Sequence, residues 1–511
     1  MSVDLRIVCR HLGLLMGVLS LLILGVGAFS GIEHGLNISQ ASGEVSGLLL
    51  SAAGGFMLSF GLLAVRQKGR GTLGQREALL LVAMSWIVGA ALAAAPFFIW
   101  GLLRDNAAED AHNFDSGVNC YFEAMSGLTT TGATIVESLA TLPRGLLLWR
   151  AMTHWLGGLG IVVLFVAVLP MLGVGGRRIY KVEAPGPTPE GVTPRIQDTA
   201  RILWLIYTGL TAIEVVALRL CGMTWFDSVC HTFATLATGG FSTVDSSVAG
   251  FDSSAVHVVI ILFMLLAGMN FGLFHRLIQR DYRNVVRDPE LRLYLGVIVV
   301  ATGLVMFSLL RSPPAGAPYG SWLLMLRDAL FQVVSIQTTT GFCTADSDQW
   351  GFLAKATLLC LMFIGGCAGS TGGGIKVVRI LIAAKVILAE LEHAYRHHVV
   401  RATRIGRSPI DNDLKVGTLV YILGIVVLFC VGSGMIHLFE GDAAAGFTTS
   451  ATAAAATLNN VGPGFARVGA TQNYVWFSAP SKLVMSTLML LGRLELFAIV
   501  VLFSPRFWRS E

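Results

Sequence analysis

Two Thr-Thr-Thr-Gly runs, at 129–132 and 338–341, carry the residues best suited to bind an ion. Each run follows a short apolar stretch and precedes a polar loop. Threonine offers a hydroxyl oxygen as well as its backbone carbonyl, and glycine adopts backbone angles that are closed to other residues. Rings of such oxygens replace the water shell of a permeating cation in ion-selective pores. The runs therefore predict cation coordination by backbone and hydroxyl oxygens.

Two related segments complete a set of four. Aligned on one glycine, they read GLTTTGATIVES, TLATGGFSTVDS, SIQTTTGFCTADS and ATLNNVGPGFARV, and the key glycines are Gly132, Gly240, Gly341 and Gly462. Glu137, Asp245 and Asp346 lie five residues past the glycine in three copies, and Arg467 takes that place in the fourth. A single copy would be explained by close packing between membrane helices. Four copies in register favour a pore.

The stretch that leads to each key glycine is too short to cross a membrane. A spanning helix needs roughly 20 apolar residues. Irregular backbone at membrane depth is tolerated only where it lines a water-filled cavity or is buried in protein. The negative C-terminal end of a short helix also favours a cation. We therefore expect re-entrant segments, each a short helix and a loop, that meet on one axis and occupy 115–132, 225–240, 324–341 and 445–462.

A glycine-rich stretch, FIGGCAGSTGGGIKVVRI at 363–380, is the second candidate for chemistry. It cannot hold a regular helix cheaply, because each glycine loses about 1 kcal/mol against alanine in a helix interior. No strand precedes it, which argues against a nucleotide-phosphate loop. A packing hinge is one alternative, and an intramembrane loop that obstructs the pore is the favoured interpretation. That gating loop spans 363–376 and includes Gly365, Gly366, Gly369, Ser370, Thr371, Gly372, Gly373 and Gly374.

Arg493 lies within the last long apolar stretch, in LMLLGRLELFAIVV. An ionisable group at that depth is costly and usually functional. Glu495 is two residues away and points to a different helix face, so the freed carbonyls of the glycine-rich stretch are the expected partners. We expect Arg493 to place a positive charge under the four loops, and the alternative is a structural ion pair with another helix. Lys376 is expected to be a cytoplasmic anchor.

Composition places these residues in a membrane. The chain has 511 residues, of which 54% are hydrophobic and only 13% charged, and its mean hydropathy is +0.70, which excludes an ordinary soluble protein. No soluble nucleotide-binding fold, HExxH motif or nucleophile with a base is apparent, so neither an enzyme nor a nucleic-acid partner is expected. Ten apolar stretches are long enough to span: 10–30, 46–65, 77–101, 147–172, 199–221, 255–274, 292–310, 352–390, 416–439 and 479–503.

The charges indicate an orientation. Lysine and arginine concentrate at both termini and in the connections 66–76, 177–201, 276–292 and 376–415, which are therefore expected to be cytoplasmic. The opposite side is expected to form an acidic mouth with Glu109, Asp110, Asp115, Glu137, Asp227, Asp245, Asp252, Asp346, Asp348, Glu440 and Asp442.

We expect an all-α polytopic membrane protein, with four helix–pore-helix–loop–helix repeats around one pseudo-fourfold ion pore, preceded by two extra transmembrane helices. The expected divisions are 1–70 for the two-helix N-terminal preamble, 71–180, 181–290 and 291–410 for repeats 1 to 3, and 411–511 for repeat 4.

Over the whole chain, these features resemble the Trk, Ktr and HKT superfamily of potassium transporters, specifically its bacterial TrkH/TrkG branch. The two-helix preamble and the Asn-Asn-x-Gly-Pro-Gly fourth loop at 459–464 carry the likeness. Glycine at all four key positions goes with potassium preference in this family. The second loop departs from the first at Ala237 and Gly239, so fourfold symmetry is approximate. The implied filter is Thr129, Thr130, Thr131, Gly132, Ala237, Thr238, Gly239, Gly240, Thr338, Thr339, Thr340, Gly341, Asn459, Asn460, Val461 and Gly462.

The resemblance further implies potassium uptake across the cytoplasmic (inner) membrane of a bacterium, through a pore gated by the glycine-rich stretch. It also implies a homodimer with one pore in each protomer, and a TrkA-like cytoplasmic subunit that binds NAD and ATP or ADP. This chain itself is expected to bind no cofactor, and to contact membrane lipid. Proton- or sodium-coupled potassium symport is the alternative, although the repeats all point the same way and Glu214 is the main buried acid expected. Glu392, His393, His397 and His398 are expected to form a solvated basic face, not a metal site.

Overall fold

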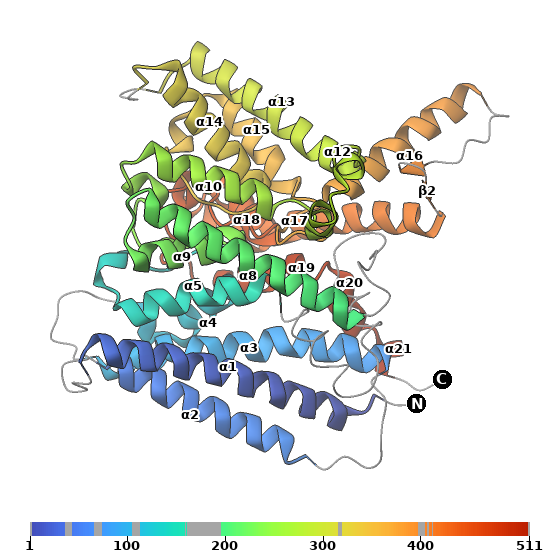
Figure 1. Cartoon of the computed structure of the whole chain (residues 1–511). Coiled ribbons are helices and arrows are strands. Elements are labelled where there is room, and N and C mark those ends of the chain that lie inside the picture. Colours follow the sequence, from blue (N-terminus) through green and yellow to red (C-terminus); the bar gives the residue numbers. More distant parts are fainter. Residues whose placement is uncertain are drawn as a thin grey trace.

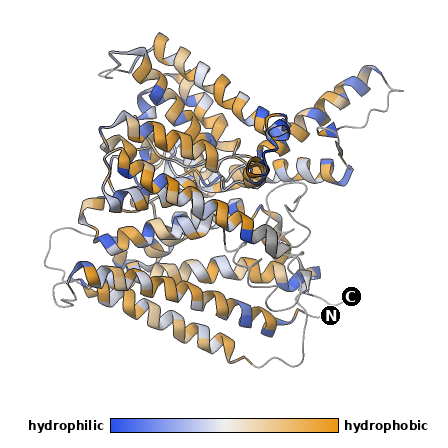
Figure 2. Ribbon diagram, in the orientation of Figure 1, coloured by the Kyte–Doolittle hydropathy of each residue, from blue (hydrophilic) through white to orange (hydrophobic). Residues whose placement is uncertain are grey.

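The computed structural model describes residues 3–35, 43–65, 74–104, 113–158, 160, 196–314, 319–396, 404–405, 408–410 and 412–508. Within these ranges most of the chain is helical, with one short antiparallel pair, β1 (Arg404–Ile405) and β2 (Ser408–Pro409) (Figure 1). Helices dominate because backbone groups in hydrocarbon must hydrogen-bond within their own segment. Figure 2 shows hydrophobic residues along the outer sides of the bundle and hydrophilic residues mostly toward its two ends.

Some expectations fall outside the described residues. They concern most of 159–172 in the fourth apolar stretch and parts of the connections 66–76, 177–201 and 376–415. They also concern the side chains of Glu109, Asp110, His397 and His398.

Six described helices are long and apolar enough to cross a membrane, and each coincides with one of the ten expected stretches. The first three pack together along one side of the bundle (Figure 1). Small residues allow this close approach, since Ser59 Oγ donates to the carbonyl oxygen of Gly13 at 2.7 Å. The six are α1 (Leu5–Glu33), α2 (Glu44–Leu63), α3 (Gln75–Leu103), α8 (Ile196–Leu220), α13 (Pro289–Arg311) and α17 (Asn412–Ala444).

Four shorter helices lead to the key glycines and run from the surface into the protein. Trp225, Trp322 and Phe447, which begin three of them, are exposed, whereas the last turns of all four are buried. Each has at most 16 residues, fewer than the roughly 20 that a membrane span needs. We call them pore helices: α4 (Gly117–Leu128), α9 (Trp225–Leu236), α14 (Trp322–Gln337) and α18 (Phe447–Leu458).

Three of the helices that follow a loop end beneath it instead of crossing as one straight rod, and most of the chain after the first such helix lies outside the described residues. This outcome corrects the expected single spans at 255–274 and 479–503. In the first, α10 and α11 are bent by 96° at Gly268–Asn270; in the second, α19 ends at Arg493 and Glu495 and Leu496 turn left-handed. The expected break in 352–390 is present. The return helices are α5 (Arg144–Gly158), α10 (Ser254–Ala267), α15 (Phe352–Phe363) and α19 (Ala479–Arg493).

The α10–α11 break costs little because its freed backbone groups find partners in the glycine-rich stretch. The amide of Cys367 donates to the carbonyl oxygen of Gly268 at 2.9 Å, and the amide of Phe271 donates to that of Gly369 at 3.0 Å. The side chain of Asn270 caps α11 by accepting from the amide of Gly272. The break therefore holds the glycine-rich stretch in place.

The remaining elements connect this framework. Helix α16 projects beyond the rest of the bundle (Figure 1), and it packs against α13 and α17. The others are η1 (Asn113–Asp115), η2 (Leu139–Thr141), η4 (Ser247–Gly250), α11 (Phe271–Ile278), α12 (Tyr282–Val286), η5 (Ser347–Gln349), α16 (Val377–Tyr395), η6 (Ala466–Val468), α20 (Phe497–Val500), η7 (Val501–Phe503) and α21 (Pro505–Trp508).

Candidate ion pathway

The pore helices all end in the same turn. At each end the amide two residues past the C-cap bonds to a carbonyl five residues back, at 2.8–2.9 Å, and the preceding amide bonds three residues back, at 2.9–3.4 Å. This hydrogen-bond pair is the Schellman motif, which requires a left-handed residue just after the helix. That residue is Thr130, Thr238, Thr339 or Asn460, with φ between 54° and 59°. Each pore helix therefore turns its chain sharply at the start of its loop.

Threonine is an unusual choice for the left-handed position, where glycine or asparagine is the norm. A β-branched residue is strained there, and strain that persists at equivalent places points to a function for the side chain. Thr339 Oγ1 accepts from the amide of Gly373 at 2.6 Å, and Asn460 Nδ2 donates to Thr131 Oγ1 at 2.9 Å. Two of these side chains thus hold the loops to their surroundings.

The key glycines close a ring. All four are left-handed, with φ between 77° and 95°. A Cβ at Gly132 would lie under 3.0 Å from the carbonyl oxygen of Gly239, and in the same way Gly240 faces Thr340, Gly341 faces Val461, and Gly462 faces Thr131. Each glycine thus abuts the residue before the glycine of the next loop, and the fourth loop closes on the first. We call these segments loop 1 (129–133), loop 2 (237–241), loop 3 (338–342) and loop 4 (459–463).

The ring brings together all of the filter residues inferred from the sequence, and their side chains are buried. In loop 1 the hydroxyls of Thr129 and Thr131 are hydrogen-bonded to each other at 2.8 Å, and in loop 3 those of Thr338 and Thr340 are at the same distance. Loops 1 and 3 are therefore built alike, as their shared Thr-Thr-Thr-Gly sequence suggests.

Loop 2 has Gly239 where loops 1 and 3 have a threonine, because a neighbouring side chain fills the space that the threonine would need. A Cβ at Gly239 would collide with the imidazole of His154, which stacks on Phe241 with ring centroids 4.0 Å apart. His154 belongs to return helix α5 and is fully buried. Sequence reasoning had registered the departure at Gly239 but not its cause.

Loop 4 has its own support. The hydroxyl of Tyr474 donates to the carbonyl oxygen of Gly462 at 2.7 Å, and its amide donates to the carbonyl oxygen of Thr134 at 2.8 Å. Tyr474 therefore ties loop 4 to the segment that follows loop 1. It was not among the residues singled out from the sequence, where a lone tyrosine after an irregular segment gives no signal.

The glycine-rich stretch lies directly under the ring. Two hydrogen bonds join the chain entering the stretch to the chain leaving it, and we call this junction the neck. The amide of Gly365 donates to the carbonyl oxygen of Ile375, and the amide of Ile375 donates to that of Phe363. Thr371 Oγ1 donates to the carbonyl oxygens of Leu236, at the end of pore helix α9, and Ala267, at the end of α10. The stretch is thus bonded to the underside of loop 2, and through Gly373 to loop 3.

Arg493 reaches the same place from the last return helix. Its Nη1 donates to the carbonyl oxygen of Thr371 at 2.8 Å, so the hydrogen bond to the glycine-rich stretch that the sequence predicts is present. Its Nη2 donates to the carbonyl oxygens of Gly157 and Gly158, where α5 ends. Glu495 pairs instead with Arg379, on α16.

Two charged residues near the stretch differ from expectation or were missed. Lys376 is not a surface anchor: it is only 5% exposed, because the closed neck turns it inward, and its Nζ donates to the carbonyl oxygen of Gly372. Glu290 accepts from the amides of Ala368, at 2.6 Å, and Val378, at 3.2 Å. It therefore fastens the stretch at two places, although it lies in the first turn of α13, far away in the sequence.

Buried acids are more numerous than expected. Glu214 is fully buried, but so are Glu44 and Glu123, and Glu290 and Asp328 are nearly so. Sequence reasoning ranked Glu214 first because it lies within a long apolar run, whereas Glu44 and Glu290 lie in the first turns of their helices and Glu123 and Asp328 lie in the short pore helices.

Several acids of the expected mouth hold backbone in place. Asp245 Oδ1 accepts from the amide of Leu139 at 2.5 Å, Glu440 accepts from that of Ser478 at 2.8 Å, and Asp348 accepts from that of Ala466. Burial raises the pKa of Asp348 above the usual aspartate value, opposed by that hydrogen bond. These acids thus brace the loops, whatever they contribute to the field at the mouth.

Comparisons with known proteins agree on one family. A model of the TrkH family, described as cation transport protein, matches residues 57–510. The Trk system potassium uptake protein TrkH of Escherichia coli (strain K12) is 39% identical over 450 residues, which cover 87% of this chain and 88% of that protein. TrkH of Halomonas elongata is 35% identical over 524 residues, covering 99% and 100%. TrkG of Escherichia coli (strain K12) is 34% identical over 470 residues, covering 89% and 90%.

The fold agrees as well. The crystal structure of the potassium transporter TrkH from Vibrio parahaemolyticus is similar with a TM-score of 0.83 and 32% identity, covering 99% of this chain and 100% of that one. The all-α polytopic fold and the TrkH/TrkG resemblance inferred from the sequence are thereby confirmed. The chain belongs to the TrkH family of cation transport proteins.

Proposed function

We propose that this protein takes up potassium across a bacterial cytoplasmic membrane through the ring of loops 1 to 4. The observation that carries the proposal is the closure of that ring, in which four left-handed glycines each face a carbonyl-bearing residue of the next loop. Such rings of backbone oxygen substitute for the hydration shell of a cation. The relatives are named potassium uptake proteins, which favours potassium as the cation.

In this proposal the filter is formed by the backbone of all four loops. The pore helices aim their negative C-terminal ends at the ring, which favours a cation there. The left-handed glycines keep side chains away from the axis, where a Cβ would strike a neighbouring carbonyl. Glycine at all four key positions, which the family resemblance associates with potassium preference, supports potassium over sodium.

The glycine-rich stretch is the proposed gate. It lies under the ring, and Arg493 bonds it to the end of α5 while adding a positive charge on the proposed conduction path. A cation leaving the filter would meet both the obstructing backbone and the like charge. In this proposal, opening breaks three sets of hydrogen bonds. They join Gly373 to Thr339, the Thr371 hydroxyl to the carbonyl oxygens of Leu236 and Ala267, and Arg493 to the carbonyl oxygen of Thr371.

The wider assembly is also part of the proposal. We assign a homodimer with one pore in each protomer, both termini in the cytoplasm, and the repeat boundaries 71–180, 181–290, 291–410 and 411–511 after a preamble at 1–70. Control of the gate is assigned to a TrkA-like cytoplasmic subunit that binds NAD and ATP or ADP. The support is the family membership together with the positive charge at both termini.

The decisive experiment is cation uptake into proteoliposomes under an imposed voltage, with potassium and sodium compared and with and without a pH gradient. Passive potassium uptake that follows the voltage alone is expected. Uptake that needs a proton or sodium gradient would favour the alternative, a coupled symporter, for which the fully buried Glu214 is the first carboxylate to replace. No potassium uptake by a folded protein, with or without those gradients, would refute the proposal.

A further inference from the structure

We infer that the ion pair of Glu123 and Arg150 is a positioning pair that holds loops 1 and 2 in register and thereby sets the preference for potassium over sodium. The inference rests on the proposed function, because selectivity has meaning only if the loops conduct. It concerns residues behind the ring, on pore helix α4 and return helix α5, and not the coordinating residues themselves.

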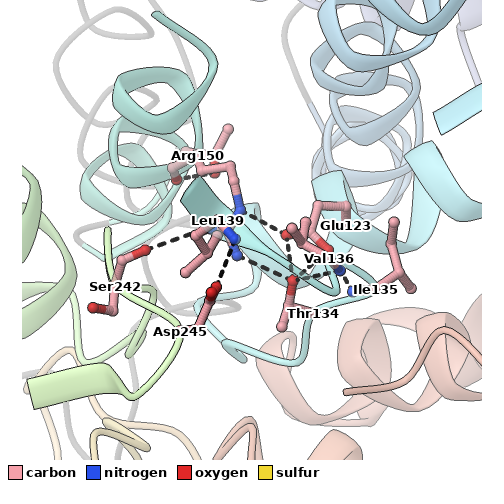
Figure 3. Close-up of polar contacts among 9 residues, drawn as sticks. Glu123, Thr134, Ile135, Val136, Leu139, Arg150, Ser242 and Asp245 are labelled. Atoms are coloured by element: carbon pink, nitrogen blue, oxygen red, sulfur yellow. Dashed lines mark hydrogen bonds and ion pairs between the residues drawn. The ribbon is translucent and has the colours of Figure 1, made fainter. Parts of the chain in front are cut away.

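Arg150 connects the outer sides of two different loops (Figure 3). Its Nε donates to Glu123 Oε1 at 2.7 Å and its Nη2 to Thr134 Oγ1 at 3.1 Å, just past loop 1. Its Nη1 donates to the carbonyl oxygen of Ser242 at 3.3 Å, just past loop 2. The guanidinium carbon also lies 3.9 Å from the ring centroid of Phe241. One side chain therefore contacts the ends of both loops.

Glu123 completes the tie on the side of loop 1. Its carboxylate accepts from Thr134 Oγ1 at 3.0 and 3.1 Å and from the amide of Ile135 at 2.9 Å, in addition to the guanidinium (Figure 3). Glu123 and Arg150 are only 1% and 2% exposed. A buried pair with this many hydrogen bonds adds little net stability over an apolar pair of the same size, but it fixes its neighbours in one arrangement.

The position of Glu123 recurs in the other repeats. It lies nine residues before Gly132, and His231 and Gln332 occupy the same register before Gly240 and Gly341. His231 Nε2 lies 2.9 Å from Ser242 Oγ, and Gln332 donates to the carbonyl oxygen of Ala345 at 2.8 Å. The residue nine positions before the key glycine therefore holds the segment that follows the loop in three repeats, and we call these contacts braces.

The first two of these braces also contact the next loop of the ring. Arg150 reaches Phe241 in loop 2, and His231 stacks on Phe342 in loop 3 with centroids 5.7 Å apart. Of the three braces, the first alone is an ion pair. A charged brace can act on a cation through its field as well as through geometry, and the two effects are separable by experiment.

The two effects predict different signs. Glu123→Gln leaves an uncompensated guanidinium behind the filter and Arg150→Gln leaves an uncompensated carboxylate, so the field alone would change potassium flux in opposite directions. Displacement of the loops would lower the potassium-to-sodium ratio in both. Because an unpaired buried charge can prevent folding, Arg150→Lys and the neutral pair Glu123→Gln/Arg150→Gln are the main variants.

Lysine keeps the charge but cannot reach Glu123, Thr134 and Ser242 at once, since it lacks the planar fork of arginine. We expect the potassium-to-sodium ratio of Arg150→Lys to fall by about tenfold, the change that corresponds to the loss of one hydrogen bond to a charged group. The neutral pair should lose at least as much. Phe241→Leu, which introduces no charge, should lower the ratio less.

The matched control is the ion pair of Arg144, exposed at the start of α5, with the partly exposed Glu33 of α1, which contacts none of the loops among the described interactions. Arg144→Gln/Glu33→Gln should leave the ratio unchanged. The assay is potassium and sodium flux into proteoliposomes, with thermal unfolding of each purified variant in parallel.

Lower selectivity in Arg150→Lys and in the neutral pair Glu123→Gln/Arg150→Gln, with both variants still folded and still passing potassium, supports the inference. Parental selectivity in both variants, even with reduced stability, overturns it and leaves the pair a purely structural contact. A parent protein that passes no potassium refutes the proposed function and the inference with it, whereas a selective parent with equally selective variants refutes the inference alone.

Discussion

Replacing Gly239 with alanine tests why loop 2 departs from the threonine pattern of loops 1 and 3. Gly239 is not left-handed, unlike Gly240, so its backbone accepts alanine without strain. The obstacle is the ring of His154, three atoms of which would lie under 3.0 Å from the new Cβ. That ring is fully buried and stacked on Phe241, so it has nowhere to move.

The structure sets the size of the effect. Overpacking a buried site by one methyl group costs about 1–3 kcal/mol. His154→Ala alone should also destabilise the protein, by about 2–5 kcal/mol, because it leaves a cavity. In the double variant the alanine methyl group occupies part of that cavity and meets no ring, so the two changes should compensate by about 1–3 kcal/mol.

Thermal unfolding in detergent and potassium flux in proteoliposomes measure this coupling. Gly239→Ala should lower both, because displacing loop 2 moves the carbonyl oxygen that faces Gly132. The double variant with His154→Ala should recover most of the stability lost by adding the methyl group. Gly209→Ala, in a helix position with no atom within 4 Å of the new Cβ, is the control and should be neutral or stabilising. Strictly additive losses in the double variant would refute the steric account.

Three further predictions concern the proposed gate and Asp348, which holds the segment after loop 4. Arg493→Gln should raise potassium flux, because it removes the charge and the bond to Thr371; unchanged flux in a well-folded variant would count against this role. Glu290→Ala should loosen the glycine-rich stretch and raise both its hydrogen exchange and potassium flux, whereas Glu290→Gln keeps an acceptor and should stay near the parent. Asp348 has a raised folded-state pKa, so its contribution to stability falls as pH rises through the window above the ordinary aspartate value. Asp348→Asn, which keeps an acceptor for Ala466, should therefore unfold at a higher temperature than the parent at neutral pH, and this advantage should vanish on acidification.

The loops were predictable because their signal is local and repeated. A left-handed position forces glycine wherever a neighbouring carbonyl leaves no room for a Cβ, and this requirement appears in the sequence as four glycines in register. Arg493 was predictable for a similar reason. A charge inside an apolar run has few acceptable surroundings, and freed backbone carbonyls are among them.

The contacts that hold the loops were not predictable, because they join residues distant in the sequence. Nothing near Gly268 shows that the amide of Cys367 will bond to its carbonyl oxygen, so the sequence predicts a continuous helix where the structure has a broken one. Glu290 lies next to polar neighbours and therefore looks exposed until the glycine-rich stretch covers it, whereas Lys376 is buried only because the two ends of that stretch are hydrogen-bonded together. The short helices and loops can be predicted from their own residues. The partner that a buried charged side chain binds, by contrast, depends on residues distant in the sequence.

The contact between Gly462 and Thr131 has a consequence for biosynthesis. Loop 4 is translated after the other three loops, so the ribosome must have passed residue 462 before the ring can close. The order of synthesis therefore keeps the proposed conduction path incomplete until loop 4 joins the ring.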